Sequence, residues 1–473
     1  MSLRVDRNRT PQRTPSEGTP RARGYRRRTL LLRAGAGTAL LAAACAPGGA
    51  RQDQATGAAG APAGQISFWH WGSQEYFVRY RTLADEFQKL QPRISVEVVL
   101  EPDIVTKLVA SISAGTPPNA FVHDFQRAQG WGKQGLVEPL DDRAKRSRIL
   151  KLSEYHKLAL DAITYKGKLQ GLPGVGIPGG AAPNLIYFNA DHFRNEGLAT
   201  PYELWKQDKW TWAAYLSACE KLVKRGPDGK MTQIPTSGSA HRLWLNSAGG
   251  KEVDDVFAPT RSFYDDPSSI KALQFLQDLR HRQRVEPVTN VRDEVGLNNN
   301  DEAFMQGRLS MSLRWTTGIN VYRPIDAFKW GMAPYPKDVT YATDYTAAGL
   351  AIARGAKDQD AAWTWIEWAS GPDGQKIDAR STTGVPFNPE AIKTFTESLK
   401  TIPALETPDV PAELIGNSKI TFLRLLSVDE AQIHREVVNP EMARLWSNEQ
   451  SAQTTGRNIA QAMNDFLRSN PQT

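Results

Sequence analysis

The first part of the folded chain alternates short apolar runs with stretches of helical spacing. The runs 66–71, 94–100 and 120–123 have the length and composition of buried strands. Apolar residues recur three and four positions apart over 76–90 and 104–112, which predicts an amphipathic helix after each of the first two strands. The order strand, helix, strand, helix, strand is typical of an α/β protein with a parallel sheet covered by helices.

The ends of these strands carry the first candidate binding residues. In open parallel sheets, ligands bind beyond the carboxyl ends of the strands. Trp71 and Ser73 follow the first predicted strand, and Asp124 follows the third. An aromatic ring beside a carboxylate suits a molecule with an apolar face and a rim of hydroxyl groups, as a sugar has. The alternative for Asp124 is a cap on the following helix, a position that favours aspartate.

Residues 1–44 have the pattern of an export signal, which we set apart from the fold. Paired arginines at 26–28 precede two leucines and resemble a twin-arginine signal, although the general secretory route stays open. The apolar run that follows is too short to span a bilayer. The residues before Cys45 resemble a bacterial lipobox, whose cysteine becomes the lipid-modified N-terminus, but Ala42 stands where leucine is usual. The alternative is plain cleavage after an Ala-x-Ala site.

Charge and cysteine content narrow the possible functions. Residues 1–44 carry a net charge of +8 and the whole chain +7, so the remainder carries −1 and offers no general basic surface for nucleic acid. Residues 45–65 are rich in Ala, Gly and Pro and predict a flexible tether. Cys219 is the only other cysteine, and we expect it to be buried in a helix, so no disulfide or cysteine-based metal site is predicted. We expect neither a cofactor nor a metal.

Several segments, in this order, resemble the extracellular solute-binding proteins that feed sugar ABC importers, the family that contains the maltose-binding protein. The matching segments are 68–72 (FWHWG), 83–87 (LADEF), 114–118 (AGTPP), 165–173 (YKGKLQGLP), 186–193 (IYFNADHF) and 303–311 (AFMQGRLSM). The resemblance implies a two-lobe periplasmic-binding-protein fold of class II, with a hinge and a ligand cleft between the lobes. It also implies a monomer that delivers its ligand to the transmembrane subunits of an ABC permease, lipid-anchored outside the cytoplasmic membrane.

The resemblance also suggests how the chain divides between the lobes. The loose Pro/Gly-rich stretch 173–180 suits a first crossing that absorbs backbone rotation, the alternative being an ordinary surface loop. On the family pattern, the first lobe comprises 66–177 with 295–354. The second lobe comprises 178–294 with 355–473.

Further cleft residues follow from the resemblance alone. The family often offers an aromatic residue from its returning segment, where this chain has Trp315, and its second lobe usually faces the cleft near Trp244. Tyr345 and Gly349 are additional candidates by position. An acidic residue at the place of Asp124 commonly accepts hydrogen bonds from sugar hydroxyls in the family.

An enzyme and a surface scaffold are the alternatives to a binding protein. A secreted glycosidase or lyase would need two carboxyl groups on either side of one glycosidic bond. Asp124 is the one convincing acid at a strand end, and the chain lacks HExxH, GxSxG and Walker patterns. The seven histidines are scattered along the sequence without metal-ligand spacing. These observations favour a carbohydrate-binding protein without catalytic residues.

Overall fold

The computed structural model describes residues 62–155, 157–175, 180–238, 240–417, 420–422, 425–427 and 429–471. The predicted signal peptide, the predicted lipidation site Cys45 and most of the predicted tether therefore lie outside the described residues. The described chain forms two larger sheets, each with helices packed around it and its own hydrophobic core. Helices and strands mix in both parts, which confirms the α/β class.

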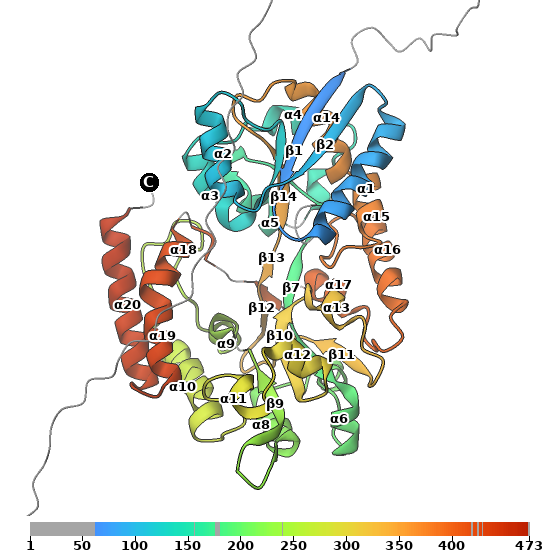
Figure 1. The fold of residues 1–473 in the computed structure, drawn as a ribbon. Helices are drawn as coiled ribbons and strands as arrows, with labels where there is room; N and C mark the ends of the chain where they lie inside the picture. The colour runs from blue at the N-terminus through green and yellow to red at the C-terminus, as the bar shows by residue number, and fades with distance from the viewer. Residues whose placement is uncertain are drawn as a thin grey trace, which may run out of the picture. The chain divides into compact units, whose positions relative to one another are not determined.

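The first sheet has the strand order β2-β1-β3-β14-β6. Its strands are β1 (Gly64–His70), β2 (Ile94–Leu100), β3 (Ala120–Asp124), β14 (Ala348–Ile352) and β6 (Leu172–Pro173). β1 runs parallel to β2 and β3, as the strand and helix order predicts. β14, which comes much later in the chain, pairs antiparallel with β3 and with β6. Figure 1 shows β14 in the same part of the fold as β1 and β2.

The helices on the first sheet bury the faces that the apolar spacing predicts. α1 (Gln74–Leu90) buries Tyr80 and Phe87 completely, while its opposite face stays exposed. The Phe87 ring lies edge-on to Trp365 of α14 (Gln359–Ser370), with ring centroids 5.3 Å apart. Such edge-to-face pairs contribute beyond the burial of their area. The remaining elements of this part are α2 (Ile104–Ser113), α3 (Phe125–Lys133), α4 (Asp141–Arg146), η1 (Leu152–Glu154), α5 (Lys157–Ala162), β4 (Thr164–Tyr165) and β5 (Lys168–Leu169).

The second sheet has the order β11-β7-β10-β9-β8, with β13 also paired to β7. Its strands are β7 (Ala182–Asn189), β8 (Lys224–Arg225), β9 (Met231–Ser237), β10 (Leu309–Trp315), β11 (Trp330–Ala333) and β13 (Tyr345–Thr346). β10 runs parallel to β9 and antiparallel to β7, so the carboxyl ends of β9 and β10 share one edge. A separate pair joins β12 (Tyr341–Thr343) to β15 (Ile420–Phe422).

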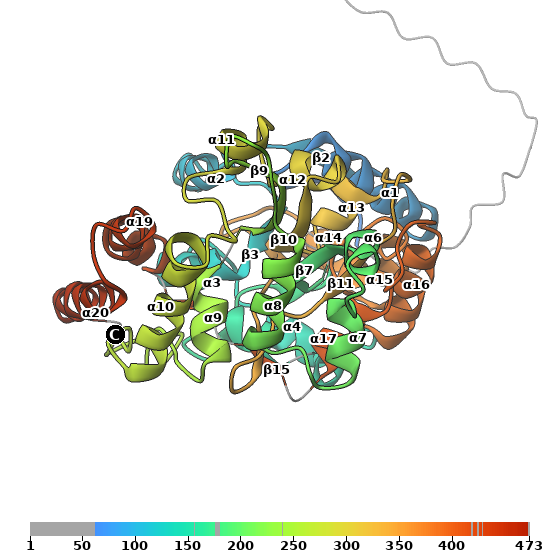
Figure 2. The same ribbon diagram turned by 90° about the horizontal axis from the view of Figure 1, so that it is seen from below.

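Helices from both halves of the sequence cover the second sheet. They are α6 (Ala190–Asn195), α7 (Pro201–Lys206), α8 (Trp212–Leu222), α9 (His241–Ser247), α10 (Pro267–His281), α11 (Val291–Val295), α12 (Asn300–Met305), α13 (Gly318–Tyr322), α16 (Pro389–Lys400), α17 (Val410–Gly416), α18 (Glu430–Ile433), the π-helical turn η2 (His434–Val438), α19 (Asn439–Trp446) and α20 (Ala452–Ser469). α20 packs against α10 and α19 (Figure 2). Cys219 on α8 is fully buried, as predicted.

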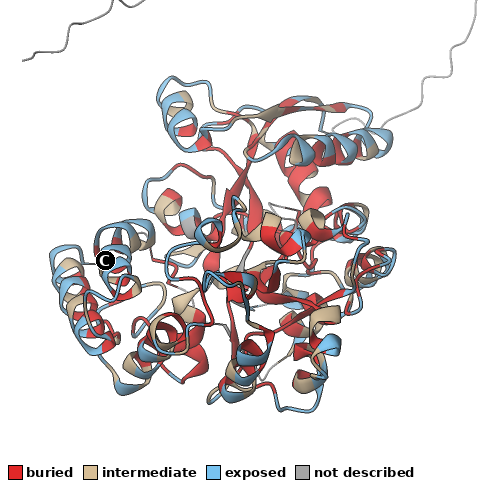
Figure 3. Cartoon of the chain, turned by 60° about the horizontal axis from the view of Figure 1, so that its bottom comes forward, coloured by how far each residue is buried: buried red, intermediate tan, exposed pale blue. Residues whose placement is uncertain are grey.

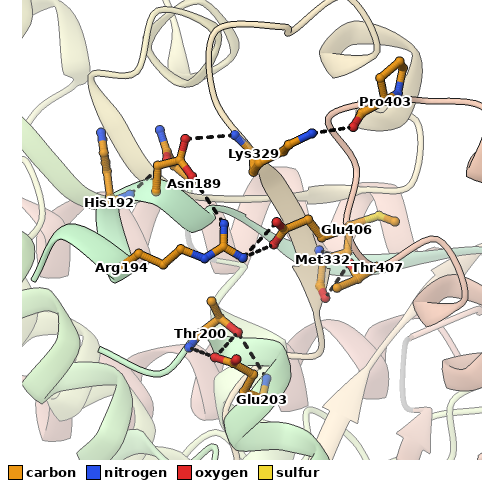
Figure 4. Close-up of polar contacts among 11 residues, drawn as sticks. Asn189, His192, Arg194, Thr200, Glu203, Lys329, Met332, Pro403, Glu406 and Thr407 are labelled. Atoms are coloured by element: carbon orange, nitrogen blue, oxygen red, sulfur yellow. Dashed lines mark hydrogen bonds and ion pairs between the residues drawn. The ribbon is translucent and has the colours of Figure 1, made fainter. Parts of the chain in front are cut away.

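Polar contacts fix the start of this covering layer. Thr200 and Glu203 form a reciprocal capping box at the start of α7, with the Thr200 N–H donating to the Glu203 carboxylate over 2.7 Å (Figure 4). Arg194 on α6 donates two hydrogen bonds of 2.8 Å to the carboxylate of Glu406. The Arg194–Glu406 pair holds the segment after α16 against α6.

The division of the chain between the two parts differs from the expected one. Residues 295–354 were expected with the first lobe, yet β10 and β11 lie within that range and pair with β7 in the second sheet. α14 was expected with the second lobe, yet its tryptophans belong to the core of the first sheet. The reason is physical: local apolar spacing sets the type of an element, whereas its sheet is set by pairing with distant strands.

Within the described residues, the chain passes between the two cores at three places joined by backbone pairing. The first crossing falls between Ala181, in the first core, and Leu185, in the second, at the start of β7. The second runs through β13, which pairs with β7. The third follows α15 (Pro372–Asp378), where the backbones of Ala181 and Val385 exchange hydrogen bonds of 2.8 and 2.6 Å. We call β13, the start of β7 and the Ala181–Val385 bridge the crossing region.

Buried side chains follow the strands of both sheets, and exposed ones lie on the outer faces of the helices (Figure 3). Within the described ranges, each helix is too short or too polar to cross a bilayer.

Candidate functional site

The carboxyl ends of β1 and β3 form one edge of the candidate site. Trp71 follows β1 directly, is partly buried and packs on the first core. The guanidinium carbon of Arg127 lies 5.6 Å from the centre of the Trp71 ring, within the range of a cation–π contact. Ser73 is exposed at the start of α1, and its side chain makes no capping hydrogen bond there. This edge presents an aromatic ring, a hydroxyl and a cation.

Asp124 is held in place by α3. Its carboxylate accepts a 2.8 Å hydrogen bond from the Arg127 N–H and pairs with the Arg127 guanidinium. The side chain of Asp124 is about 9 % exposed and that of Arg127 is 42 % exposed. The helix-cap alternative is therefore the role seen in the structure, and the exposed Arg127 is the charged group beside Trp71.

Two buried histidines brace the same strand ends. His70 Nδ1 lies 2.8 Å from the Trp71 carbonyl oxygen, and His123 Nδ1 lies 3.3 Å from that of Asp124. Burial lowers the pKa of His123 to about 4, against a smaller raising effect of this hydrogen bond, so the ring is neutral at pH 7 and its Nδ1–H donates. These histidines fix the backbone from which Trp71 and Asp124 project.

The carboxyl end of β10 forms the second edge. Trp315 ends this strand, is partly buried, and its carbonyl accepts a 3.0 Å hydrogen bond from the Tyr187 hydroxyl. The preceding Arg314 pairs with Asp301. A hollow of about 400 Å³ lies beside them, lined by Asn290, Val291, Asn298, Asn299, Asn300, Asp301, Ser312, Leu313 and Arg314. Amide side chains and a guanidinium are donors and acceptors suited to hydroxyl groups.

The crossing region brings these two edges near one another along a continuous backbone. Asp124, at the end of β3, pairs with Ala348 at the start of β14. β13 precedes β14 by one residue and pairs with the start of β7. The N–H of Thr316, the residue after β10, donates a 3.0 Å hydrogen bond to the Pro183 carbonyl in β7. The two edges are therefore linked by strand pairing through β14, β13 and β7.

A direct contact also joins the two parts of the chain. The Asn320 amide on α13 donates a hydrogen bond to the Glu75 carboxylate in the first turn of α1. α1 packs on the first sheet and α13 on the second. The candidate site therefore has groups from both parts within contact distance of each other.

Two predicted cleft residues lie elsewhere. Trp244 is fully buried in the second core, with its ring 5.1 Å from that of Tyr215 and 5.7 Å from that of Trp212, so the prediction that it faces the cleft is wrong. Gly349 lies inside the first sheet, where an added Cβ would come within 2.5 Å of the Leu172 carbonyl oxygen. Its role is close packing of strands, which explains a glycine at that position. Tyr345 lies in β13, within the crossing region, and its side chain is not described.

Sequence reasoning missed several polar residues of the site. They are Arg127, Arg314, Asn320 and the asparagines 298–300. The run of three asparagines at 298–300 is typical of a loop and can be recognised in the sequence. Its position beside β10 depends on the pairing of β9 with β10, which no local pattern specifies. A further hollow, of about 840 Å³, is lined mainly by α7, α17 and the start of β12, and we assign it no role.

Two covered sheets joined by three adjacent crossings, with polar and aromatic groups at the facing strand ends, define a two-lobe binding-protein fold. The family model of the bacterial extracellular solute-binding proteins matches residues 82–407, more than half of the chain. The chain belongs to this family. It is accordingly an exported binding protein and not an enzyme.

Individual relatives agree with this assignment. The chain is 22 % identical over 399 residues to the maltotriose-binding protein of Pyrococcus abyssi, covering 82 % of this chain and 76 % of that one. Its fold matches an ABC substrate-binding protein from Listeria monocytogenes in complex with cycloalternan, with a TM-score of 0.71, 18 % identity, and 85 % and 99 % of the two chains covered. It also matches UgpB from Mycobacterium tuberculosis in complex with glycerophosphocholine, with a TM-score of 0.68, 17 % identity, and coverage of 86 % and 99 %.

Proposed function

We propose that this protein is the substrate-binding component of an ABC importer and binds a sugar or oligosaccharide between its lobes. The observation that carries the proposal is the convergence of two strand edges, one with Trp71 and one with Trp315, on the crossing region. Each edge combines an aromatic ring with charged or amide groups. The maltotriose-binding relative and the cycloalternan complex support a carbohydrate as ligand.

Binding a sugar requires both aromatic rings and hydrogen-bonding groups. Stacking a ring on the apolar face of a sugar removes both surfaces from water, and each hydroxyl that leaves water must regain a hydrogen-bond partner or cost about 1–3 kcal/mol. Micromolar affinity corresponds to about −8 kcal/mol. Two aromatic rings with Arg127, Arg314 and the asparagines beside β10 are sufficient for such an affinity. Closure of the lobes completes this set, and the transmembrane subunits of a permease recognise the closed form.

The first test is ligand binding by the purified mature protein. We expect calorimetric titration with a panel of monosaccharides and oligosaccharides to give micromolar binding of at least one of them without any product by chromatography. Trp71→Ala and Trp315→Ala should each weaken that binding at least tenfold, about 1.4 kcal/mol. Asp124→Asn keeps a side-chain oxygen that can accept the capping hydrogen bond at the start of α3. A loss of binding in this variant would therefore reflect a lost ligand contact and not a weakened helix.

Phe263→Ala is the matched control. Like Trp71, Phe263 is a partly buried ring beside an arginine, and the guanidinium carbon of Arg261 lies 4.6 Å from the ring centre. Unlike Trp71, it follows none of the strands that form the candidate site. This variant should bind as the parent does. Normal binding by both tryptophan variants would contradict the placement of the site. Cleavage of a glycan in the same samples would overturn the binding-protein role.

We further infer that the mature protein is a monomer anchored by a lipid on Cys45 to the outer face of the cytoplasmic membrane, after export with residues 1–44 as signal peptide. The tether 45–65 would then let the lobes reach a permease. A lipid-modified cysteine holds a protein stably at a bilayer when it carries two or three acyl chains. We expect the native protein to fractionate with membranes, and Cys45→Ser to be found in the soluble fraction. Mass spectrometry that finds an unmodified N-terminus in the membrane fraction would refute the anchor.

A further inference from the structure

Three potential metal ligands meet in the second lobe although they are far apart in the sequence. His241 begins α9, Glu252 lies in the loop after α9, and His434 begins the π-helical turn η2. One ligand atom from each lies within 4.8 Å of the other two. Nε2 of His434 is 3.6 Å and Nε2 of His241 is 3.9 Å from Oε1 of Glu252. Single-turn π-helices are frequent at functional sites.

The cluster is largely enclosed, and one of its nitrogen atoms lacks a partner. The side chains are 15 % (His241), 5 % (Glu252) and 14 % (His434) exposed. Tyr264 donates a 2.7 Å hydrogen bond to Glu252 Oε1, and its hydroxyl oxygen lies 2.8 Å from His241 Nε2. Among the described residues, nothing bonds to the buried Nε2 of His434. Leaving a buried ring nitrogen unsatisfied costs about 1–3 kcal/mol, so a bound ion there would be stabilising.

The cluster offers two imidazole nitrogens and a carboxylate, which are groups that bind zinc in proteins. Metals bind the neutral imidazole and the ionised carboxylate. The neighbouring cation, Arg242, forms a 2.6 Å ion pair with Asp344, which offsets its charge.

We propose that His241, Glu252 and His434 bind a zinc ion. Two imidazoles and one carboxylate are a common ligand set for zinc, with bonds of about 2.0–2.2 Å. A tetrahedral ion with such bonds places its ligand atoms about 3.3–3.5 Å apart, so distances of 3.6 and 3.9 Å need only a small contraction. On binding, zinc replaces the Tyr264 contact of His241 Nε2, while Tyr264 keeps its bond to Glu252. Water takes the fourth position.

The proposed ion acts as a structural clamp. It ties α9 and the following loop to η2, the turn that leads into α19 and α20. These helices form the outer layer beside α10 and contact the rest of the lobe through few other elements. The ion therefore reduces the opening of the C-terminal helices, and its binding free energy adds to the stability of the lobe.

The test uses the purified mature protein, stripped with a chelator and titrated with zinc chloride. We expect one equivalent of zinc to bind with a dissociation constant of micromolar or below and to raise the melting temperature. Cobalt at the same site should give the absorption bands of a tetrahedral ion. His434→Ala should lose the zinc-induced rise in melting temperature, measured against the metal-free form of the same variant.

His192→Ala is the control, because this half-buried histidine bonds Ser310 and lies outside the cluster. It should retain the full response to zinc. Glu252→Gln should lower zinc affinity at least tenfold, and circular dichroism will show that the variant is folded. Absence of a zinc-dependent rise in the parent protein, or an equal rise in His434→Ala, would overturn the proposal.

Discussion

At the scale of single residues, position relative to a strand end decides the exposure of a side chain more than residue type does. Trp71 and Trp244 were both predicted to face a ligand. Trp71 follows a strand and stays partly exposed, whereas Trp244 lies on the inner face of a helix among Trp212 and Tyr215. A lone tryptophan on a helix carries no signal for a cleft, since its large apolar surface favours the core. Strand ends could be predicted from periodicity, and the residues placed there are the ones that remain candidates.

Gly349 supplies a test at this scale. A Cβ at this position would lie 2.5 Å from the Leu172 carbonyl oxygen and 3.2 Å from Nε2 of His123. Neither group can move freely, because one is backbone of β6 and the other is a buried ring. We expect Gly349→Ala to destabilise the protein by about 1–3 kcal/mol, the usual cost of overpacking, as measured by urea unfolding.

Gly130 provides the comparison. It lies in α3, and a Cβ there would meet only the Gln134 amide nitrogen at 4.0 Å. Gly130→Ala should leave stability unchanged or raise it by up to about 1 kcal/mol, since alanine favours the helix. If Gly349→Ala and Gly130→Ala had the same free energy of unfolding, the strands around Gly349 would have room for an added methyl group.

At the scale of elements, the sequence predicted type and approximate bounds well in the first sheet. The strands expected at 66–71, 94–100 and 120–123 correspond to β1, β2 and β3, and the two helices between them are α1 and α2. Apolar spacing is a local property, and these elements also pair with their near neighbours in sequence. β10 and β14 are different, because their partners are distant in the chain and no local pattern specifies them.

The capping box of α7 is open to a test. The Thr200 hydroxyl accepts from the Glu203 N–H, and the Glu203 carboxylate accepts from the Thr200 N–H. Thr200→Ala removes the first of these bonds at a buried position, and we expect it to lower the free energy of unfolding by about 1 kcal/mol. Chemical denaturation of the parent and variant measures the difference.

Thr364→Ala is the matched change in α14, where the hydroxyl donates only to the Asp360 carbonyl of its own helix. Its effect should stay within about 0.5 kcal/mol. If Thr200→Ala costs no more than this, the capping box does not stabilise the second lobe.

At the scale of the whole molecule, the sequence established the α/β class and, through resemblance, the two-lobe fold. The run 173–180, rich in proline and glycine between two patterned regions, is visible locally, and the first crossing falls just after it, between Ala181 and Leu185. The later crossings were misplaced, since each lies among short segments whose lobe depends on strand pairing. The candidate site follows the same rule: the sequence marks residues at strand ends, such as Trp71, as candidates, whereas polar residues that distant loops bring beside them, such as Asn298, carry no local signal of that position.

β14 is synthesised long after β3, its partner in the first sheet, and this order affects how the protein folds. β14 stands between β3 and β6, and α14 after it completes the core of the first lobe. A ribosome that has synthesised only the first half of the chain has therefore released a sheet with β3 open along one side. Unpaired strand edges invite pairing with other chains. The first lobe therefore lacks the strand between β3 and β6 until β14 has been made, and until then one side of β3 is available to pair with other chains.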